Sequence, residues 1–175
     1  MIITGKDIVK DKFFYTQELC LGTLDTSLIC EKTCVEMRII MYTYTEEKKF
    51  TKEQVQELFL SINWVSGNYP ERLYRALMNS STVLTVWDGE RLVGLIRVLD
   101  DTAMLAQIHY VIVHPDYQGK GIAGRMIEYI KEKYKNFLYI DCMPAEKKNV
   151  AFYEKYGFSV MENGTAMQIC NYCNS

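Results

Sequence analysis

The chain has 175 residues, which is enough for one sizeable hydrophobic core but short for two independent domains. Hydrophobic residues make up 49% and charged residues 24%, a balance that excludes a disordered chain or a fibrous repeat. The formal net charge is -2 without any long basic run, so we expect no nucleic-acid partner, because such a surface must neutralise many phosphates.

No apolar stretch reaches the roughly 18 residues that a membrane span needs, and residues 1–7 become polar before a signal-peptide core could form. We therefore expect no membrane partner and a cytoplasmic protein. In that setting the six cysteines are expected to be reduced thiols rather than a disulfide framework. Cys170 and Cys173 supply only two metal ligands and both histidines lie far off in sequence, so no metal site is expected.

Residues 1–36 show no clean hydrophobic period and are expected to form an N-terminal extension. Such an extension either packs on the core or mediates self-association, for example in a homodimer. The remaining residues, 37–175, are expected to form a single domain, which opens with an alternating, strand-like segment from Met37 to Thr45.

Two helices are expected next. The segment Thr51–Gln54 fits a capping box, in which Thr51 accepts from the third helical amide, and apolar residues then recur at helical spacing. This pattern predicts a helix over 52–63. Trp64–Tyr69 is expected to be a loop before Pro70, which suits the first turn of a second helix.

The middle of the chain predicts strands. Val83–Trp87 and Leu92–Leu99 are rich in β-forming residues, and Asp88-Gly89 between them is a strong hairpin signal, so the two strands are expected to pair antiparallel. A third strand is expected over Met104–Val113. Apolar residues at helical spacing within Met126–Tyr134 predict the helix that follows.

The C-terminal part predicts four short elements. We expect a strand at Phe137–Cys142 and a helix at Asn149–Tyr156. Two closing strands are expected at Phe158–Met161 and Thr165–Cys170. The predicted order is therefore antiparallel hairpins first, followed by β-α-β-α-β-β.

The segment Gln118–Gly124 joins a predicted strand to a predicted helix and holds Gly119, Gly121 and Gly124. At such a junction several unpaired backbone N–H groups and the positive end of the helix dipole converge on one point. Glycines let the backbone turn and approach an anion without a Cβ in the way. The segment therefore predicts a diphosphate site, and the alternative is a plain tight turn.

The same glycines match G-x-G-x-x-G, and Asp141 lies twenty residues beyond Gly121, as in a dinucleotide-binding fingerprint. In that fingerprint the glycines follow their strand almost directly, whereas five residues separate Val113 from Gly119. Too little chain remains for the rest of a doubly wound sheet. The dinucleotide interpretation is kept as the less favoured alternative.

Together with its flanks, the segment Val111–Ala123 resembles the acetyl-CoA signature of the GNAT N-acetyltransferase superfamily, written Q/R-x-x-G-x-G/A. Ala151–Phe158 resembles the second motif of that superfamily, aromatic-Tyr-Glu-Lys-x-Gly-Phe. The two motifs cover roughly Met104–Val160 in the expected order. Residues 37–103 fit the element order of the family without a specific motif, and residues 1–36 fall outside the resemblance.

The resemblance implies an α+β fold with a central mixed, mostly antiparallel sheet of six to seven strands and about four flanking helices. The sheet would splay beyond Val113, where backbone groups of Val111 and Val113 would bond the pantetheine of acetyl-CoA. The implied pyrophosphate-binding residues are Gln118, Gly119, Lys120, Gly121, Ile122, Ala123 and Gly124. Asn149 would flank the thioester, although many relatives carry that asparagine three residues earlier, where this chain has Glu146.

The resemblance assigns to Tyr153 the proton that the departing thiolate needs. With regular alternation along its strand, His109 shares a face with Val111 and Val113 and points toward the gap as a candidate base. The position resembles one of two histidines that arylalkylamine N-acetyltransferases place on this strand, and the other place holds Gln107. The alternative is a structural histidine.

The resemblance implies an acceptor wall that includes Trp64, Tyr69 and Tyr110. The nearby carboxylates of Asp100 and Asp101 would suit a small cationic amine, and the alternative is that they are scattered surface acids. The implied reaction moves an acetyl group from acetyl-CoA to a primary amine of a small molecule or peptide, by direct attack in a ternary complex and without a metal. A CoA-binding sensor without turnover is the alternative from another class of function.

Overall fold

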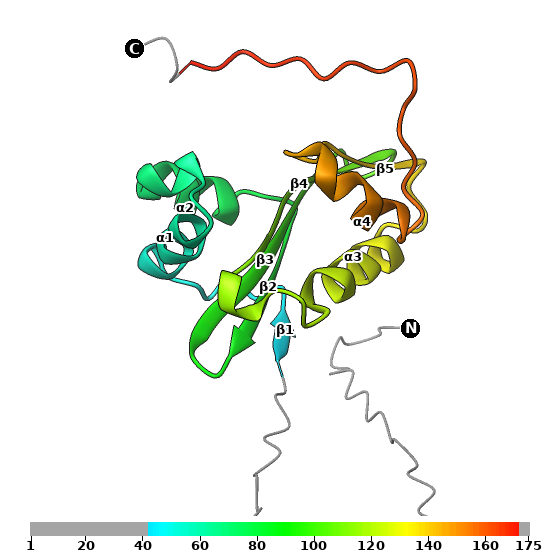
Figure 1. Ribbon diagram of the computed structural model, residues 1–175. Helices are drawn as coiled ribbons and strands as arrows, with labels where there is room; N and C mark the ends of the chain where they lie inside the picture. The colour runs from blue at the N-terminus through cyan, green and yellow to red at the C-terminus, as the bar shows by residue number, and fades with distance from the viewer. Residues whose placement is uncertain (1–41, 172–175) are drawn as a thin grey trace, which may run out of the picture. The chain divides into compact units, whose positions relative to one another are not determined.

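The computed structural model describes residues 42–171, which form one sheet and the helices that flank it (Figure 1). The strands are β1 (Thr43–Thr45), β2 (Thr82–Asp88), β3 (Arg91–Asp100), β4 (Leu105–Val113) and β5 (Tyr139–Cys142). The helices are α1 (Lys52–Ser61), α2 (Pro70–Met78), α3 (Ile122–Lys133) and α4 (Val150–Glu154), with short 3-10 turns η1 (Val65–Asn68), η2 (Pro115–Tyr117) and η3 (Lys147–Asn149). The predicted extension over residues 1–36 lies outside the described residues.

The strands form one sheet in the order β1-β2-β3-β4-β5. Neighbouring strands are antiparallel from β1 to β4, whereas β4 and β5 are parallel. This confirms the mixed, mostly antiparallel α+β fold. It also excludes the dinucleotide interpretation, because that fingerprint belongs to a doubly wound parallel sheet.

The described sheet has five strands rather than the predicted six to seven. The closing strands expected at 158–161 and 165–170 are wrong, because residues 155–171 contain no strand. Their apolar side chains lie in solvent, with Met161 72% and Met167 91% exposed. A strand is stabilised mainly by the face that it buries, and these residues have no core surface to cover.

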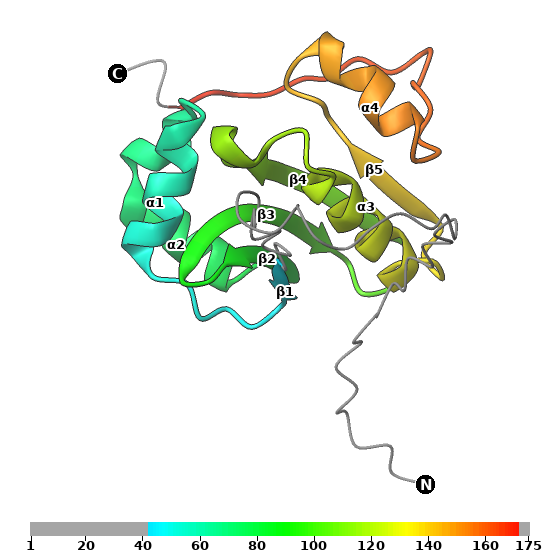
Figure 2. The ribbon, with the colours of Figure 1, turned by 60° about the horizontal axis from the view of Figure 1, so that its bottom comes forward.

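Helices cover both faces of the sheet (Figures 1 and 2). On the face of α3 and α4, Met126 and Ile130 pack with Ile108 of β4 in one buried cluster. On the opposite face, that of α1 and α2, Phe59 packs with Ile112 of β4 in a second buried cluster. We name these the α3/α4 face and the α1/α2 face. β4 contributes to both, so its side-chain directions decide what reaches each face.

Local sequence explains where several elements begin. The capping box predicted before α1 is present: Thr51 Oγ1 accepts from the Gln54 N–H at 3.2 Å, and Gln54 Oε1 accepts from the Thr51 N–H at 2.8 Å. Pro70 begins α2, as predicted. Gly89 takes φ +57° in the turn between β2 and β3, a conformation that glycine adopts without a steric penalty.

The cysteines of the described range differ in state. Cys142 is a free thiol, whereas Cys170 is disulfide-bonded. The expectation of reduced thiols is therefore wrong for Cys170, because a compartment argument from sequence says nothing about the pairing of one particular cysteine.

Within residues 42–171, no three His, Cys, Asp or Glu side chains are grouped to hold a metal ion. No helix there is long and apolar enough to cross a membrane.

Candidate active site

The segment Gly119–Gly124 forms a run of unpaired backbone donors at the start of α3. The N–H groups of these six residues have no hydrogen-bond acceptor among the described residues. On either side the pairing resumes, since the Gln118 N–H bonds to the Pro115 oxygen and the Arg125 N–H to the Gly121 oxygen, both at 3.2 Å. Consecutive free amides at a helix N-terminus suit a group with several phosphate oxygens.

Two glycines give this loop its shape. Gly119 and Gly121 take φ +75° and φ +78°, a region that other residues rarely adopt. A β-carbon built on either would meet no protein atom within 4 Å, so the loop is open where these residues lie. Lys120 between them holds its ammonium group 4.7 Å from the centre of the Tyr117 ring. The residues present therefore fit a diphosphate, as the sequence predicts.

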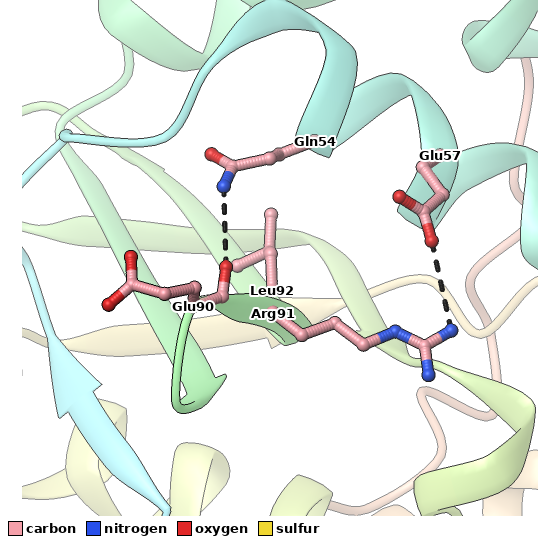
Figure 3. Close-up of a pocket in the computed structure, with 5 residues that line it drawn as sticks. All are labelled: Gln54, Glu57, Glu90, Arg91 and Leu92. Carbon is pink, nitrogen blue, oxygen red and sulfur yellow. Dashed lines mark hydrogen bonds and ion pairs between the residues drawn. The ribbon is translucent and has the colours of Figure 1, made fainter.

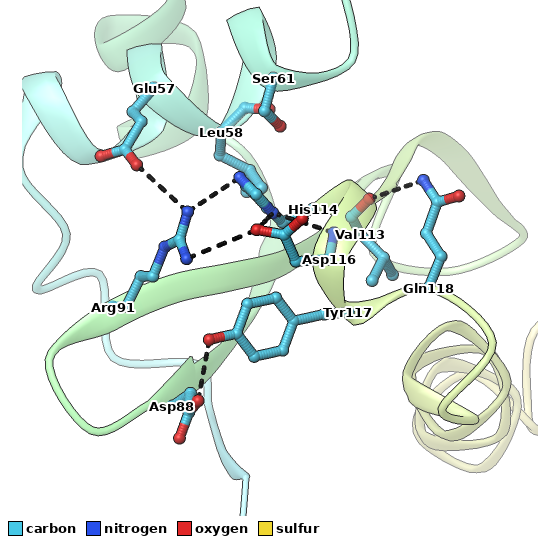
Figure 4. A network of polar contacts seen from close by, with 10 residues as sticks. All are labelled: Glu57, Leu58, Ser61, Asp88, Arg91, Val113, His114, Asp116, Tyr117 and Gln118. Atoms are coloured by element: carbon cyan, nitrogen blue, oxygen red, sulfur yellow. Dashed lines mark hydrogen bonds and ion pairs between the residues drawn. The ribbon is translucent and has the colours of Figure 1, made fainter.

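Gln118 differs from the other predicted phosphate-binding residues. Its side-chain Nε2 donates to the Val113 carbonyl at 3.1 Å, so the side chain turns back onto the end of β4 (Figure 4). Its backbone N–H is already bonded within η2. Gln118 therefore fastens the loop to the strand, and the free donors begin at Gly119.

β4 has an open backbone edge beside this loop. The parallel pairing of β4 with β5 ends at Ile108 and Cys142, after which the two strands separate (Figure 2). The His114 N–H bonds across to the Val93 oxygen of β3 at 2.9 Å. Because successive backbone groups alternate in direction, those of Val111 and Val113 point away from β3 and into the gap. The Val113 carbonyl already accepts from Gln118 Nε2, so the open groups are those of Val111 and the Val113 N–H. The predicted splay is present, and both valines line it.

A β-bulge in β4 changes the predicted position of His109. Tyr110 pairs with Arg97 and Ile108 pairs with Val98, so His109 is the extra residue between them. Ile108 and Val111 both belong to the α3/α4 face, although their positions differ by three, which regular alternation would place on opposite faces. His109 therefore shares the α1/α2 face with Tyr110, and not the face of Val111 that regular alternation predicts.

The proton of the His109 ring is fixed by its neighbour. Arg97 Nη1 lies 3.0 Å from His109 Nδ1, and because a guanidinium can only donate, Nδ1 accepts and the proton lies on Nε2. Partial burial of the ring and the charge of Arg97 both lower the pKa of His109. A proton taken up at Nδ1 would break this bond and face a cation. In this arrangement His109 is a neutral donor through Nε2–H.

Aromatic rings form a wall on the same face. The Tyr110 ring lies 5.0 Å from the rings of both Phe59 and Trp64, and 4.1 Å from that of His109, between ring centres. Its hydroxyl is 3.0 Å from Ser66 Oγ in η1, which ties the loop between α1 and α2 to β4. Trp64 and Tyr110, two of the predicted acceptor residues, are thus brought together beside His109.

Tyr153 of α4 lies on the other side of the gap, with its ring 5.1 Å from that of Phe152 and 5.7 Å from that of Phe158. Burial, with a smaller contribution from nearby Cys142 of β5, raises the pKa of Tyr153 to about 12. No hydrogen bond to its hydroxyl is found in the described chain. The phenol therefore keeps its proton at neutral pH and is available to donate it.

Comparison with known proteins decides the family. The profile of the acetyltransferase (GNAT) family matches residues 43–158, which include the phosphate loop, the open edge of β4 and Tyr153. The chain belongs to this family. The uncharacterised N-acetyltransferase ycf52 of Pyropia yezoensis is 26% identical over 136 residues, covering 75% of this chain and 78% of that protein. The ycf52 protein of Gracilaria tenuistipitata var. liui is 36% identical over 117 residues, covering 63% of each chain.

Solved structures agree with this GNAT assignment. A GNAT-family acetyltransferase of Streptococcus pneumoniae TIGR4 superposes with a TM-score of 0.65 at 28% identity, over 75% of this chain and 98% of that one. A probable acetyltransferase of methicillin-resistant Staphylococcus aureus superposes with a TM-score of 0.67 at 27% identity, over 74% of this chain and 99% of that one. This chain therefore shares the fold of these two acetyltransferases over nearly their full length.

Three of the residues predicted for the site, Ile122, Gly124 and Tyr69, have surroundings that limit what they can offer a ligand. The Ile122 side chain is only 2% exposed and belongs to the core, so its amide alone can face a ligand. Gly124 is covered by Tyr156, whose ring carbon Cζ would lie 2.9 Å from a β-carbon at that position. Tyr69 is 41% exposed at the start of α2, with Arg72 5.8 Å from its ring centre. Among residues 42–171, the rings found in contact with Tyr110 are those of Phe59, Trp64 and His109.

The side chain of Asn149 is available for a ligand, whereas those of Asp100 and Asp101 already make hydrogen bonds. The Asn149 side chain makes no hydrogen bond within the described residues, although its N–H bonds to the Glu146 oxygen at 3.0 Å. Asp100 accepts from the Tyr134 hydroxyl at 2.7 Å, and Asp101 Oδ1 accepts three backbone N–H groups from residues 103–105. Asp100 therefore bonds to the end of α3 as well as to the Thr102 N–H, and Asp101 stabilises its own turn, so both carboxylates expected for a cationic acceptor already accept hydrogen bonds within the chain.

A polar network holds the entrance of the phosphate loop (Figure 4). Arg91 of β3 lies 3.0 Å from His114 Nε2, 3.7 Å from Glu57 and 3.9 Å from Asp116. The Tyr117 hydroxyl donates to Asp88 Oδ2 at 2.8 Å. These contacts link α1, the β2–β3 hairpin and η2, and they fix the backbone immediately before the unpaired donors.

A separate hollow of about 370 Å³ lies between α1 and the β2–β3 hairpin, lined by Gln54, Glu57, Glu90, Arg91 and Leu92 (Figure 3). Gln54 Nε2 donates to the Glu90 oxygen at 3.4 Å across it. Neither the open edge of β4 nor Tyr153 lines this hollow. We therefore place the active site at the gap between β4 and β5.

Two charged residues lie on the α1/α2 face: sequence reasoning missed Arg97, and it considered Asp141 only as part of the dinucleotide fingerprint. Arg97 is the one charged side chain within the apolar run from residue 92 to 99, and that exception was the available signal. Asp141 of β5 has one buried carboxylate oxygen, Oδ1, without a hydrogen-bond partner among the described residues, and burial raises its pKa. Residues 140 and 142 pack on the α3/α4 face, which leaves Asp141 on the opposite one.

Proposed function

We propose that this GNAT protein transfers an acetyl group from acetyl-CoA to a primary amine of a small molecule or peptide. The observation that supports it most directly is the run of free N–H groups from Gly119 to Gly124, next to the open edge of β4. A diphosphate held by these N–H groups would allow the pantetheine of acetyl-CoA to extend along the open edge of β4. Acetyl-CoA supplies the activated thioester when bound.

The two sides of the gap contribute to different steps of the proposed reaction. On one side Tyr153 keeps a proton that the departing thiolate of CoA accepts as the carbon–sulfur bond breaks. On the other side the amine nitrogen attacks the thioester carbonyl in a ternary complex and forms the amide bond. The ammonium form of the acceptor first gives a proton to bulk water, because His109, with its Nδ1 bonded to Arg97, is not free to take it.

The acceptor approaches from the α1/α2 face in this proposal. Trp64 and Tyr110 form an apolar wall there, and the His109 Nε2–H adds a donor. The Asn149 side chain flanks the thioester from the side of α4. Amphipathic rings beside a single polar group suit a small acceptor or the end of a peptide.

A thermal-unfolding experiment tests the cosubstrate half of the proposal. A ligand that binds only the folded state raises the melting temperature by a predictable amount, so acetyl-CoA is expected to stabilise the protein and NAD is expected not to. A screen of amines with acetyl-CoA, read as thiol release, then tests turnover. Stabilisation by acetyl-CoA without thiol release from any amine would favour the CoA-binding sensor.

A further inference from the structure

Arg97 is a half-buried cation on the acceptor side of the active site. Its Nε donates to Ser80 Oγ at 2.7 Å and its Nη1 to His109 Nδ1 at 3.0 Å. The guanidinium carbon lies 5.4 Å from the centre of the Tyr110 ring. All of these contacts are to neutral groups. The side chain is half-buried, and this partial removal of its charge from water lowers the pKa of Arg97.

Arg97 has no ion pair anywhere in the part of the chain that the structure describes. Arg91 on the same strand, by contrast, has carboxylates of Glu57 and Asp116 within 4 Å. The aspartates closest to Arg97 in sequence, Asp100 and Asp101, are bonded to other groups. A charge withdrawn from water normally has a counter-ion, because desolvation disfavours an unpaired ion.

The bulge brings a second donor beside this cation. His109 and Tyr110 both lie opposite Arg97, at the level where β4 and β5 begin to separate. Because His109 accepts from Arg97 through Nδ1, its Nε2–H is left as a donor. The site therefore combines the guanidinium N–H groups that Ser80 and His109 leave free, which suit the oxygens of a carboxylate or phosphate, with a neutral N–H group.

The geometry points to an acceptor that carries a negative charge: Arg97 and the His109 Nε2–H bind a carboxylate or phosphate of the amine substrate. This inference rests on the proposed acetyl transfer and names the substrate class of that same site. It reverses the charge expected from Asp100 and Asp101. A bound anion would replace the missing counter-ion of Arg97 and would hold the amine near the gap.

Matched pairs of amines test the inference. L-Phenylalanine and 2-phenylethylamine differ by a carboxylate, and O-phosphoethanolamine and ethanolamine differ by a phosphate. A charge-assisted hydrogen bond is worth about 1.5–3 kcal/mol, so we expect the anionic member of at least one pair to have a kcat/KM about 10-fold to 100-fold higher. The pair that shows the preference tells carboxylate from phosphate.

Three variants assign the preference. Arg97→Gln is expected to reduce the ratio within the preferred pair to near one, and Arg97→Lys to leave part of it, because the charge stays while the fork is lost. Arg75→Gln removes an exposed arginine of α2 and is the matched control, in which the ratio is unchanged. Equal turnover within both pairs, or a preference that persists in Arg97→Gln, would overturn the inference.

A binding measurement separates this inference from the proposed function. Melting temperatures are taken with CoA and each anionic amine, for the native chain and for Arg97→Gln. Stabilisation that Arg97→Gln abolishes, without turnover of any amine, would uphold the anion site and refute the proposed acetyl transfer. Turnover of neutral amines alone, without stabilisation by either anionic amine, would refute the anion site and uphold acetyl transfer.

Discussion

The hydroxyl of Tyr156 occupies the place where a β-carbon on residue 124 would lie, so Gly124 and Tyr156 fit together only because residue 124 has no side chain. Gly124 belongs to the first turn of α3, and Tyr156 follows α4. This contact therefore joins the phosphate loop to the segment that carries Tyr153.

The contact between Gly124 and Tyr156 predicts a loss of stability in Gly124→Ala. Alanine normally favours a helix over glycine, but here overpacking should cost about 1–3 kcal/mol in the free energy of unfolding, measured by urea denaturation. Tyr156→Phe removes the overlapping oxygen, so Gly124→Ala combined with Tyr156→Phe should regain part of the loss. A double variant whose loss equals the sum of the two single losses would contradict the contact.

The backbone at Gly121 predicts a specific loss of acetyl-CoA binding. In Gly121→Val a β-branched residue must adopt φ +78°, so the loop should relax and misalign its free donors. Calorimetric titration should then show no measurable acetyl-CoA binding. Gly89→Ala is the control, because Gly89 also has a positive φ, +57°, but lies in the β2–β3 turn. An equal loss of affinity in both variants would show that the effect is general strain.

Tyr153→Phe should lower kcat by about 10-fold to 1,000-fold while the Kd of acetyl-CoA stays close to normal, because the ring remains and only the proton donor is lost. The native pKa of Tyr153 is raised to about 12. Ionisation of this phenol should therefore produce no fall in kcat between about pH 7 and 10, well below that pKa. A native rate in the variant would reduce Tyr153 to a packing residue.

His109→Gln separates a base from a donor. Glutamine can accept from Arg97 and donate outward, as the neutral imidazole does, so the rate should fall by less than about 10-fold if His109 is a donor, whereas loss of a base costs about 100-fold to 10,000-fold. Because the pKa of His109 is lowered, any acidic limb from its protonation should lie below about pH 6.5 and disappear in the variant.

The lowered pKa of His109 also predicts how the stability of the folded protein depends on pH. The folded state binds the His109 proton more weakly than the unfolded state, so folding favours the neutral ring. Its contribution to stability is complete above the unfolded pKa and is lost as the pH falls through the lowered folded pKa. A limb that remains in His109→Gln would belong to another group.

Features that depend on neighbouring residues in the sequence were predictable. The capping box at Thr51 and Gln54, the hairpin at Gly89 and the loop from Gly119 to Gly124 each depend on a few adjacent residues whose backbone preferences act locally. The predicted boundaries of α1 and β4 lie within two residues of the observed ones for the same reason.

Features that depend on contacts between residues far apart in the sequence could not be predicted from local patterns. Regular alternation put His109 on the face of Val111, and only the register of β4 against β3 shows the bulge. The closing strands have a strand-like composition but find no surface to cover. The neutral partners of Arg97 come from the turn that follows α2 and from β4, which no local pattern connects.

The bulge at His109 also determines how the chain tolerates changes in length. Removing His109 would let Tyr110 follow Ile108 directly, opposite Arg97 and Val98, so that β4 alternates strictly and every side chain beyond the deletion keeps its face. Val111 and Val113 would stay in the α3/α4 cluster, and Ile112 would stay in the α1/α2 cluster. The strand can therefore lose this one extra residue without the exchange of faces that a deletion in a regular strand would cause.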